Sequence, residues 1–275
     1  MNDNPLAGYF RKPAIHMTLP SKGNFYPAGS LEMPETKELP VYPMTALDEI
    51  TYRTPDALFN GSAIVDVIQS CIPSIKNAWE MPSIDIPSIL ANIRIASFGH
   101  EMDINTVCPS CEEPANYQFD LRSISDSLKV TDYTKPLKLG DMQIFFKPLT
   151  YRDMNDNSKL NFEEQQMNKV INDAEMSEED RIRAMSEAFT KISTLTLDAL
   201  TNNIMSIKTP EATVTEPEYI LDFIKHCDRD IFKKIRDEIA ERRKGTDLKP
   251  IKIVCEECGH EYTQPFTLDM TTFFE

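Results

Sequence analysis

The sequence predicts an α+β fold in three parts: an extended N-terminal arm, a mixed core, and an α-helical domain inserted into that core. Three observations lead to this prediction. Many of the 19 prolines gather near the start of the chain, two similar Cys-x-x-Cys segments lie far apart, and the stretch between them has helical periodicity. We therefore expect a proline-rich arm over 1–52, a core with a split zinc ribbon over 53–149 plus 246–275, and a helical insertion over 150–245.

The chain has 275 residues, of which 44 are acidic and 29 basic, so its formal net charge is −15. This length suits one large or two small domains, and a hydrophobic share of 41% is typical of a globular protein. The negative charge argues against nucleic acid and anionic membranes as partners, because both carry charge of the same sign. No apolar run approaches the ~20 residues of a membrane span, and no secretion signal opens the sequence, so we expect a soluble cytoplasmic protein.

The N-terminal arm is predicted from its prolines, which lie between Pro5 and Pro43. Each proline fixes φ and lacks an N–H donor, so the arm should consist of extended pieces and turns rather than helix. Its apolar residues would be costly to leave in water, which allows two interpretations: the arm packs along its own domain, or it reaches onto a neighbouring subunit. Under the second interpretation, the candidate partner-binding residues are Leu6, Tyr9, Phe10, Phe25 and Tyr26.

Three short helices should follow the arm. Thr54 is suited to cap the first, Pro73 stops the second, and Gly99 suits the end of the third. Cys71 falls on the apolar face of the second helix, so we interpret it as a small core residue rather than a ligand. The expected helices cover residues 54–61, 62–72 and 85–98.

Apolar–polar alternation then predicts strands, and the region 150–245 returns to helical periodicity. Capping boxes at Ser177–Asp180 and Thr215–Glu218 open two of its helices, and a last helix begins near Asp230. The cations at the end of this helix either bind a partner or, as we expect, complement the helix dipole on a solvated face. The strands are expected over 102–107, 117–121 and 142–146, and the cations are Arg242, Arg243 and Lys244.

The strongest chemical signal is a repeated cysteine pattern. Each copy predicts a strand, a tight Cys-x-x-Cys turn and a returning strand, and two such hairpins with facing thiolates form a zinc ribbon. Gly259 suits the left-handed residue that such turns contain, whereas Glu112 at the equivalent place departs from it. The matching positions are Ile104, Val107, Cys108, Cys111, Phe119 and Leu121 in the first copy, and Ile251, Val254, Cys255, Cys258, Phe266 and Leu268 in the second.

We therefore expect one structural Zn²⁺ bound by Cys108, Cys111, Cys255 and Cys258. The alternatives are two separate, partly ligated sites, a redox pair, or His100 or His260 in place of a cysteine; the strand context and the cytoplasmic setting disfavour redox chemistry and disulfides. Joining the hairpins closes a long loop at an entropic cost of about 4–5 kcal/mol. Structural zinc contributes on the order of 10–16 kcal/mol in small peptides, so the metal can offset that cost.

No constellation in the sequence supports an enzyme. There is no phosphate-binding glycine loop, no His-Glu-x-x-His and no nucleophile elbow, so no catalytic residue and no small-molecule substrate is assigned. Four cysteines close the zinc coordination shell, which indicates a structural ion. An alternative function is a zinc-ribbon adaptor for transcription or other nucleic-acid machinery. The acidic neighbours of the cysteines, which would repel phosphates, argue against it: Glu112, Glu113, Glu256 and Glu257.

Six stretches of the sequence are distinctive: PLAGYF at 5–10, LPSKGNFYP at 19–27, LPVYPMTALDEI at 39–50, TPDALFNG at 54–61, SCIP at 70–73 and CPSC at 108–111. Together they resemble the baseplate hub assembly proteins of T-even-like contractile-tailed bacteriophages. The resemblance covers about the first 125 residues. It implies a non-enzymatic structural or assembly role, with other phage baseplate and tail proteins as partners. It also implies a location in the host cytoplasm during assembly and in the tail baseplate of the virion.

Overall fold

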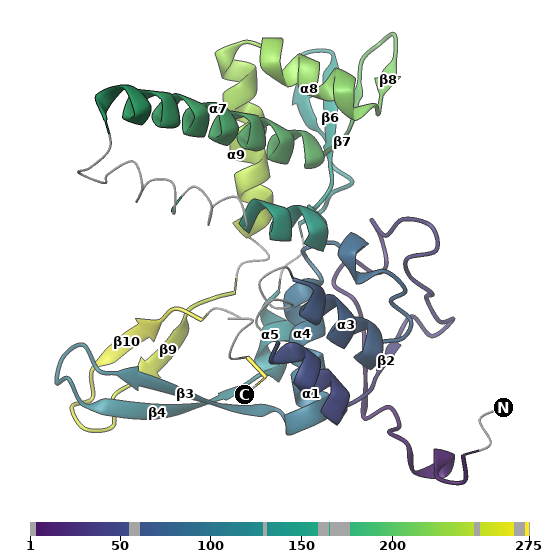
Figure 1. The fold of residues 1–275 in the computed structure, drawn as a ribbon, viewed down its shortest axis with the longest axis vertical. Coiled ribbons are helices and arrows are strands. Elements are labelled where there is room, and N and C mark those ends of the chain that lie inside the picture. The colour runs from purple at the N-terminus through teal and green to yellow at the C-terminus, as the bar shows by residue number, and fades with distance from the viewer. Residues whose placement is uncertain are drawn as a thin grey trace. The chain divides into compact units, whose positions relative to one another are not determined.

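The computed structural model divides the chain into two compact units. Unit 1 combines Met1–Val130 with Thr246–Glu275, and unit 2 is Thr131–Gly245 (Figure 1). None of the described helices is long and apolar enough to cross a membrane. The helix expected over 54–61 falls largely outside the described residues. The structure describes residues 4–54, 61–128, 131–158, 165, 177–244, 248–266 and 273–274.

Helices form the centre of unit 1. Gly61 begins α3 in a left-handed conformation, and Gly99 ends α4 with a positive φ of 93°. Both expected helices are confirmed, and their apolar residues supply much of the core. The bounds are η1 Ala7–Tyr9, α1 Ala46–Tyr52, α3 Ser62–Cys71, η2 Ala78–Glu80, α4 Ile86–Phe98 and α5 Arg122–Ser127. The fully buried side chains include Ile64, Ile68, Ile72, Ile89, Leu90 and Ile93.

The N-terminal segment packs along unit 1 only from Arg11 onward. Its strand β1 (Ile15–Met17) pairs antiparallel with β2 (Leu39–Val41), and Met17, Leu39 and Val41 are buried. The chain does not stay extended to residue 52 as expected, since α1 starts at Ala46. The reason is a capping box, in which the Thr45 hydroxyl accepts from the Asp48 N–H and the Asp48 carboxylate accepts from the Thr45 N–H.

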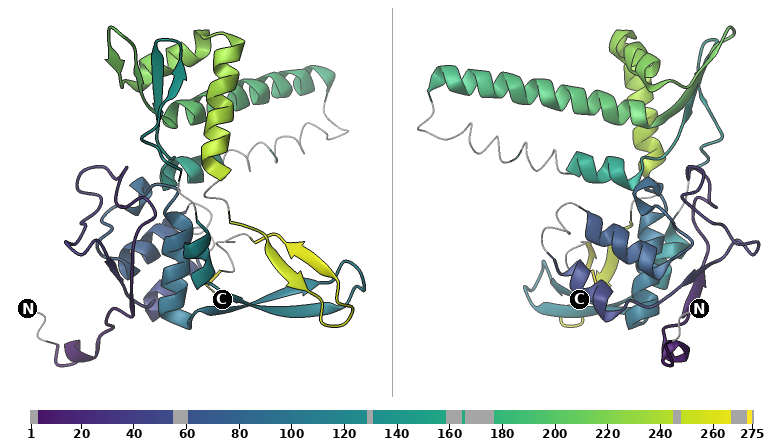
Figure 2. Two further views of the ribbon diagram at one scale, coloured as in Figure 1. Left: turned by 180° about the vertical axis from the view of Figure 1, so that it is seen from behind. Right: turned by 45° about the vertical axis from the view of Figure 1, so that its right-hand side comes forward.

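Two β-hairpins complete unit 1, and they lie side by side in Figures 1 and 2. One joins β3 (Glu101–Val107) to β4 (Pro114–Asp120), and the other joins β9 (Ile251–Val254) to β10 (Glu261–Gln264). Each is a two-stranded antiparallel sheet. Strand pairs of this size are marginal in water, so these hairpins need support from each other or from a metal.

Unit 2 contains a sheet as well as helices. The strands pair in the order β5-β6-β7-β8, with Ile144 of β6 opposite Ile207 of β7. Residues 137–146, expected in the core domain, therefore belong with the expected helical insertion, because β6 pairs with a strand that follows α7. The elements are β5 Leu137–Leu139, β6 Met142–Phe146, α7 Glu178–Asn202, β7 Ile204–Lys208, β8 Thr213–Val214, α8 Pro217–His226 and α9 Arg229–Lys244.

The two helix starts expected in this unit have different outcomes. Ser177 caps α7 by accepting the N–H of Asp180, as predicted. The predicted Thr215–Glu218 box is wrong: the N-cap of α8 is Glu216, and its carboxylate accepts the N–H of Thr215. Proline at the first helical position already fixes φ and lacks an N–H, which reduces what a cap must satisfy.

One local motif occurs in both units, although the sequence analysis did not identify it. Pro-x-Thr-x-x-Asp follows β2 as Pro43–Asp48 and follows β6 as Pro148–Asp153. In the second copy the Thr150 N–H donates to Asp153 at 2.9 Å, and the Asp153 N–H donates back to the Thr150 hydroxyl at 3.1 Å. The same strand-to-helix turn is thus built twice from the same residue types.

Candidate metal centre

The four predicted cysteines lie on two equivalent turns. Cys108 and Cys111 are in the β3–β4 turn, and Cys255 and Cys258 are in the β9–β10 turn. In each turn the residue after the second cysteine donates its N–H to the carbonyl of the first, over 2.9 Å for Glu112 to Cys108 and 2.9 Å for Gly259 to Cys255. The sequence repeat is therefore also a repeat of backbone geometry.

The residue after each second cysteine has a left-handed backbone. Its φ is 59° at Glu112 and 69° at Gly259. The turn thus imposes the same backbone conformation whether or not the residue is glycine. Glu112 differs from the expected glycine in residue type but not in backbone geometry. The next residue closes the hairpin, since the Cys108 N–H donates to the Glu113 carbonyl at 3.0 Å and the Cys255 N–H to the His260 carbonyl at 2.9 Å.

The four thiols form one cluster. All four Sγ atoms lie within 4.8 Å of one another, and the separations are 3.7 Å for Cys108–Cys258 and 3.7 Å for Cys111–Cys255. A tetrahedral ion with Zn–S bonds of about 2.3 Å places its sulfurs about 3.8 Å apart. The residues therefore fit one four-coordinate metal shared by both hairpins, with two buried cysteines, Cys108 and Cys255, and two exposed ones.

The backbone prepares Cys108 for a metal. The N–H of Cys111, together with the N–H of Ser110, lowers the pKa of the Cys108 thiol to about 6 against the opposing effect of burial. The thiolate is the metal-binding form of cysteine, so a low pKa favours ligation at Cys108. Against the lowering effect of the Glu113 N–H, the neighbouring thiols and burial raise the pKa of Cys111 to about 12. Cys71 and Cys227 lie outside the cluster, as does every histidine that the structure describes.

The hairpins also touch each other away from the sulfurs. The Thr106 hydroxyl donates to the Gln264 amide oxygen at 3.1 Å, and the Phe119 and Phe266 rings lie 4.9 Å apart. These two phenylalanines occupy equivalent positions in the repeat. Contacts of this size hold two hairpins together only weakly, which leaves the cysteine cluster as their main connection.

The predicted partner-binding residues fall into two groups. Leu6, Tyr9 and Phe10 are exposed, at 61%, 86% and 52%. Phe25 and Tyr26 are half-buried, and the Tyr26 hydroxyl donates to the Asp85 carboxylate at 3.1 Å. The first group is largely exposed to solvent, whereas the second group is partly covered by unit 1. The structure therefore separates the early residues of the arm from the later ones.

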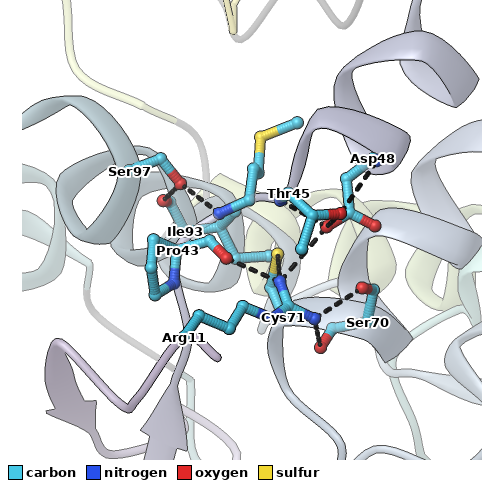
Figure 3. Close-up of polar contacts among 9 residues, drawn as sticks. Arg11, Pro43, Thr45, Asp48, Ser70, Cys71, Ile93 and Ser97 are labelled. Atoms are coloured by element: carbon cyan, nitrogen blue, oxygen red, sulfur yellow. Dashed lines mark hydrogen bonds and ion pairs between the residues drawn. The ribbon is translucent and has the colours of Figure 1, made fainter. Parts of the chain in front are cut away.

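Arg11 marks the boundary between these groups, and the sequence analysis missed it. Its guanidinium donates to the carbonyl of Pro43 at 2.6 Å, to the carbonyl and hydroxyl of Ser70 at 2.8 Å each, and to the Asp48 carboxylate at 3.2 Å. Figure 3 shows these contacts converging from three segments of unit 1. No periodicity or motif around Arg11 signals this role, because its partners are distant in sequence.

Arg242 corrects a second expectation. It was expected on a solvated face, but its side chain is 5% exposed. The guanidinium pairs with Glu238 at 2.8 Å, donates to the Lys135 carbonyl at 2.7 Å, and lies over the rings of Tyr133 and Phe146. The helix end is therefore packed within unit 2, since arginine can bury its charge when every donor finds an acceptor or an aromatic face.

Comparison with known proteins identifies the family. The family model described as T4 bacteriophage base plate protein matches residues 27–275. No curated protein and no solved structure was found to match the chain. The match confirms the resemblance to T4-like baseplate proteins, and it extends through both cysteine turns and unit 2, beyond the stretches that first suggested it. The chain belongs to the family of T4 bacteriophage base plate proteins.

Proposed function

We propose that this protein is a non-enzymatic structural component that assists assembly of the baseplate hub, through contacts with other baseplate and tail proteins. The family match over residues 27–275 is the observation that carries the proposal. Its site of action is the host cytoplasm during assembly and the tail baseplate afterwards. Exposed apolar residues Leu6, Tyr9 and Phe10 supply one partner contact, since their burial is available only at an interface.

The four-cysteine cluster binds one structural Zn²⁺ in this proposal. Sulfur separations of 3.7 Å fit a tetrahedral shell, and four thiolates leave no coordination position for a substrate. When bound, the ion links the two hairpins through its coordination bonds, and few other contacts join them. Cys108, Cys111, Cys255 and Cys258 hold it, and backbone N–H groups lower the pKa of the Cys108 thiol.

The test combines metal analysis with phage genetics. We expect about one zinc per purified chain for the wild type, by mass spectrometry, and a large loss for Cys255→Ser. Cys227→Ser is the matched control, because Cys227 is a half-buried free cysteine outside the cluster, and it should keep its zinc.

In cells, a phage that carries a nonsense codon in this gene should fail to make complete baseplates. Wild-type protein supplied from a plasmid should restore them, and Cys227→Ser should do the same. Complete, infectious tails assembled without the protein would contradict the structural role. A purified wild-type chain with far less than one metal ion would contradict the zinc site.

A further inference from the structure

The two hairpins enclose a groove of about 310 Å³. Consecutive residues of both strands line it, 114–117 on β4 and 253–257 on β9 with its turn. Side chains on one face of a strand come from every second residue, so a wall of consecutive residues is the edge of a strand. The groove therefore runs between two strand edges and not over a sheet face.

These edges are available for pairing. In the described structure β4 pairs with β3 alone and β9 pairs with β10 alone. Each strand consequently directs a row of backbone N–H and C=O groups away from its partner, which is the arrangement that accepts an added strand. Both walls exist only where the two halves of the ribbon meet, because one comes from before unit 2 in the sequence and the other from after it.

The side chains along the groove are apolar or acidic, apart from the neutral polar Asn116 and the ligand Cys255. Ala115, Tyr117 and Val254 give it apolar surface, and Val254 is 57% exposed. Glu113, Glu256 and Glu257 add negative charge, and none of the described residues that line the groove is basic. Four thiolates around a divalent ion would leave two further negative charges nearby.

We propose that this groove binds an extended, basic segment of another tail protein by strand addition. Lysine or arginine side chains of that segment would face the glutamates, and its alternate apolar side chains would cover Val254 and Tyr117. The inference rests on the proposed function, since a metal that joins the hairpins is what keeps the two walls opposite each other. It names a second interface, separate from the exposed residues near the N-terminus.

Purified full-length protein and a short fluorescent peptide that alternates lysine and valine test this inference. We expect saturable binding in an anisotropy titration, weakened by added salt, and no binding of the matching glutamate–valine peptide. A lysine–valine peptide with every backbone nitrogen methylated should bind far more weakly, because it has no N–H group to donate to either strand edge. Equal binding of the methylated peptide would overturn strand addition, and equal binding of the acidic peptide would overturn the charge assignment.

The repeat itself provides a matched pair of variants. Val254 and Val107 each precede the first cysteine of their turn and are 57% and 59% exposed, but only Val254 lines the groove. Val254→Lys should weaken binding of the lysine–valine peptide about tenfold or more, because like charges would meet in the groove. Val107→Lys should leave it within about twofold, since that side chain lies outside the groove. Equal effects of the two substitutions would overturn the assignment of the groove.

Metal content measured on the same sample separates this inference from the proposed function. A chain that carries its zinc but does not bind the peptide overturns the groove and leaves the metal site intact. Removal of the metal by a chelator should abolish peptide binding, and unchanged binding after verified removal would contradict the dependence on the ribbon. If Val254→Lys instead breaks up a dimer of the purified chain and no peptide binds, the occupant is a second copy and the proposal is wrong.

Discussion

Asp85 is a fully buried carboxyl group at the start of α4, where it connects the N-terminal arm to the helical core. It accepts the Ser21 N–H at 2.7 Å, the Ser21 hydroxyl at 2.6 Å and the Tyr26 hydroxyl at 3.1 Å. Burial raises the pKa of Asp85 to about 6, although these donors oppose the shift. Burial also raises the pKa of Tyr26 far above its usual value, so its hydroxyl remains a donor.

This raised pKa predicts a pH-dependent stability. Between about pH 4 and pH 6 the folded chain binds more protons at Asp85 than the unfolded chain does. The contribution of Asp85 to the free energy of unfolding therefore falls as the pH rises through this range, by about 3 kcal/mol in total. Asp85→Asn cannot titrate. The free energy of unfolding of both proteins is measured in urea at pH 4 and at pH 7. The difference between variant and wild type should shift in favour of the variant by about that amount from pH 4 to pH 7. A difference between Asp85→Asn and wild type that is the same at pH 4 and pH 7 would contradict the argument.

Glu112 and Gly259 predict opposite effects of substitution at equivalent positions. Both residues have a left-handed backbone, which costs a non-glycine residue about 1–2 kcal/mol. Glu112→Gly should therefore raise the free energy of unfolding of the metal-loaded protein by roughly 1 kcal/mol. The conformational entropy that glycine loses on folding reduces this gain. Gly259→Ala should lower it, for conformational reasons alone, because no heavy atom lies within 4 Å of the added Cβ. Thermal unfolding measures both, and a destabilising Glu112→Gly would show that the glutamate has a compensating contact.

At the scale of elements, the end of α9 depends on Arg242. Its guanidinium holds the carbonyl of Lys135, just before β5, and lies over Phe146 of β6, so one side chain fixes the helix end against the sheet. Arg242→Ala would leave Glu238 without this partner and open space between the rings. We expect a loss of about 3 kcal/mol in the free energy of unfolding.

The neighbouring Arg243→Ala is the control for Arg242. Arg243 is exposed, and exposed charges of this kind contribute at most about 1 kcal/mol. Denaturant titration of the two variants compares them directly. Similar losses for both would mean that the helix end is stabilised by its charge near the C-terminal dipole and not by packing of Arg242.

The two cysteine-bearing hairpins were the most predictable part of the fold. Strand alternation, the two-residue gap between cysteines and the spacing from each cysteine pair to the phenylalanine after it are all local patterns. The structure brings the sulfurs and the two phenylalanine rings together as the pattern requires. Helices α3 and α4 were equally accessible, because their apolar spacing and terminal glycines are local signals. The start of α1 was missed, since the expected continuity of the proline-rich arm obscured the Thr45–Asp48 box.

At the scale of the whole molecule, Arg11 predicts where a deletion begins to affect folding. Deletion of residues 1–10 removes only exposed residues, 4–10, from the described structure, and these include Leu6, Tyr9 and Phe10. The melting temperature should therefore stay unchanged while copurification with tail proteins weakens. Deletion through Lys12 also removes the Arg11 hydrogen bonds and should lower stability by about 2 kcal/mol. Equal melting-temperature losses for the two deletions, with partner binding intact, would place the first ten residues in the fold of unit 1 instead.

The division into units follows from long-range pairing, which composition does not reveal. The sequence places residues 137–146 next to the first cysteine turn, and nothing local shows that β6 pairs with β7 beyond α7. The same limitation hid Arg11 and Asp85, whose partners lie tens of residues away in the chain. A repeated Pro-x-Thr-x-x-Asp motif was visible in the sequence, and a search for repeats outside the cysteines would have found the second strand-to-helix turn.

The sequence by itself determined the features that arise from neighbouring residues: strand and helix periodicity, the two cysteine turns, and the likeness to baseplate proteins. Only the tertiary structure decided which distant segments meet. It buried Asp85 and Arg242, separated the exposed Leu6, Tyr9 and Phe10 from the half-buried Phe25 and Tyr26, and formed a groove between β4 and β9. The physical reason is that burial and pairing are properties of contacts across the fold, whereas periodicity and turn chemistry are already present in a short stretch of chain.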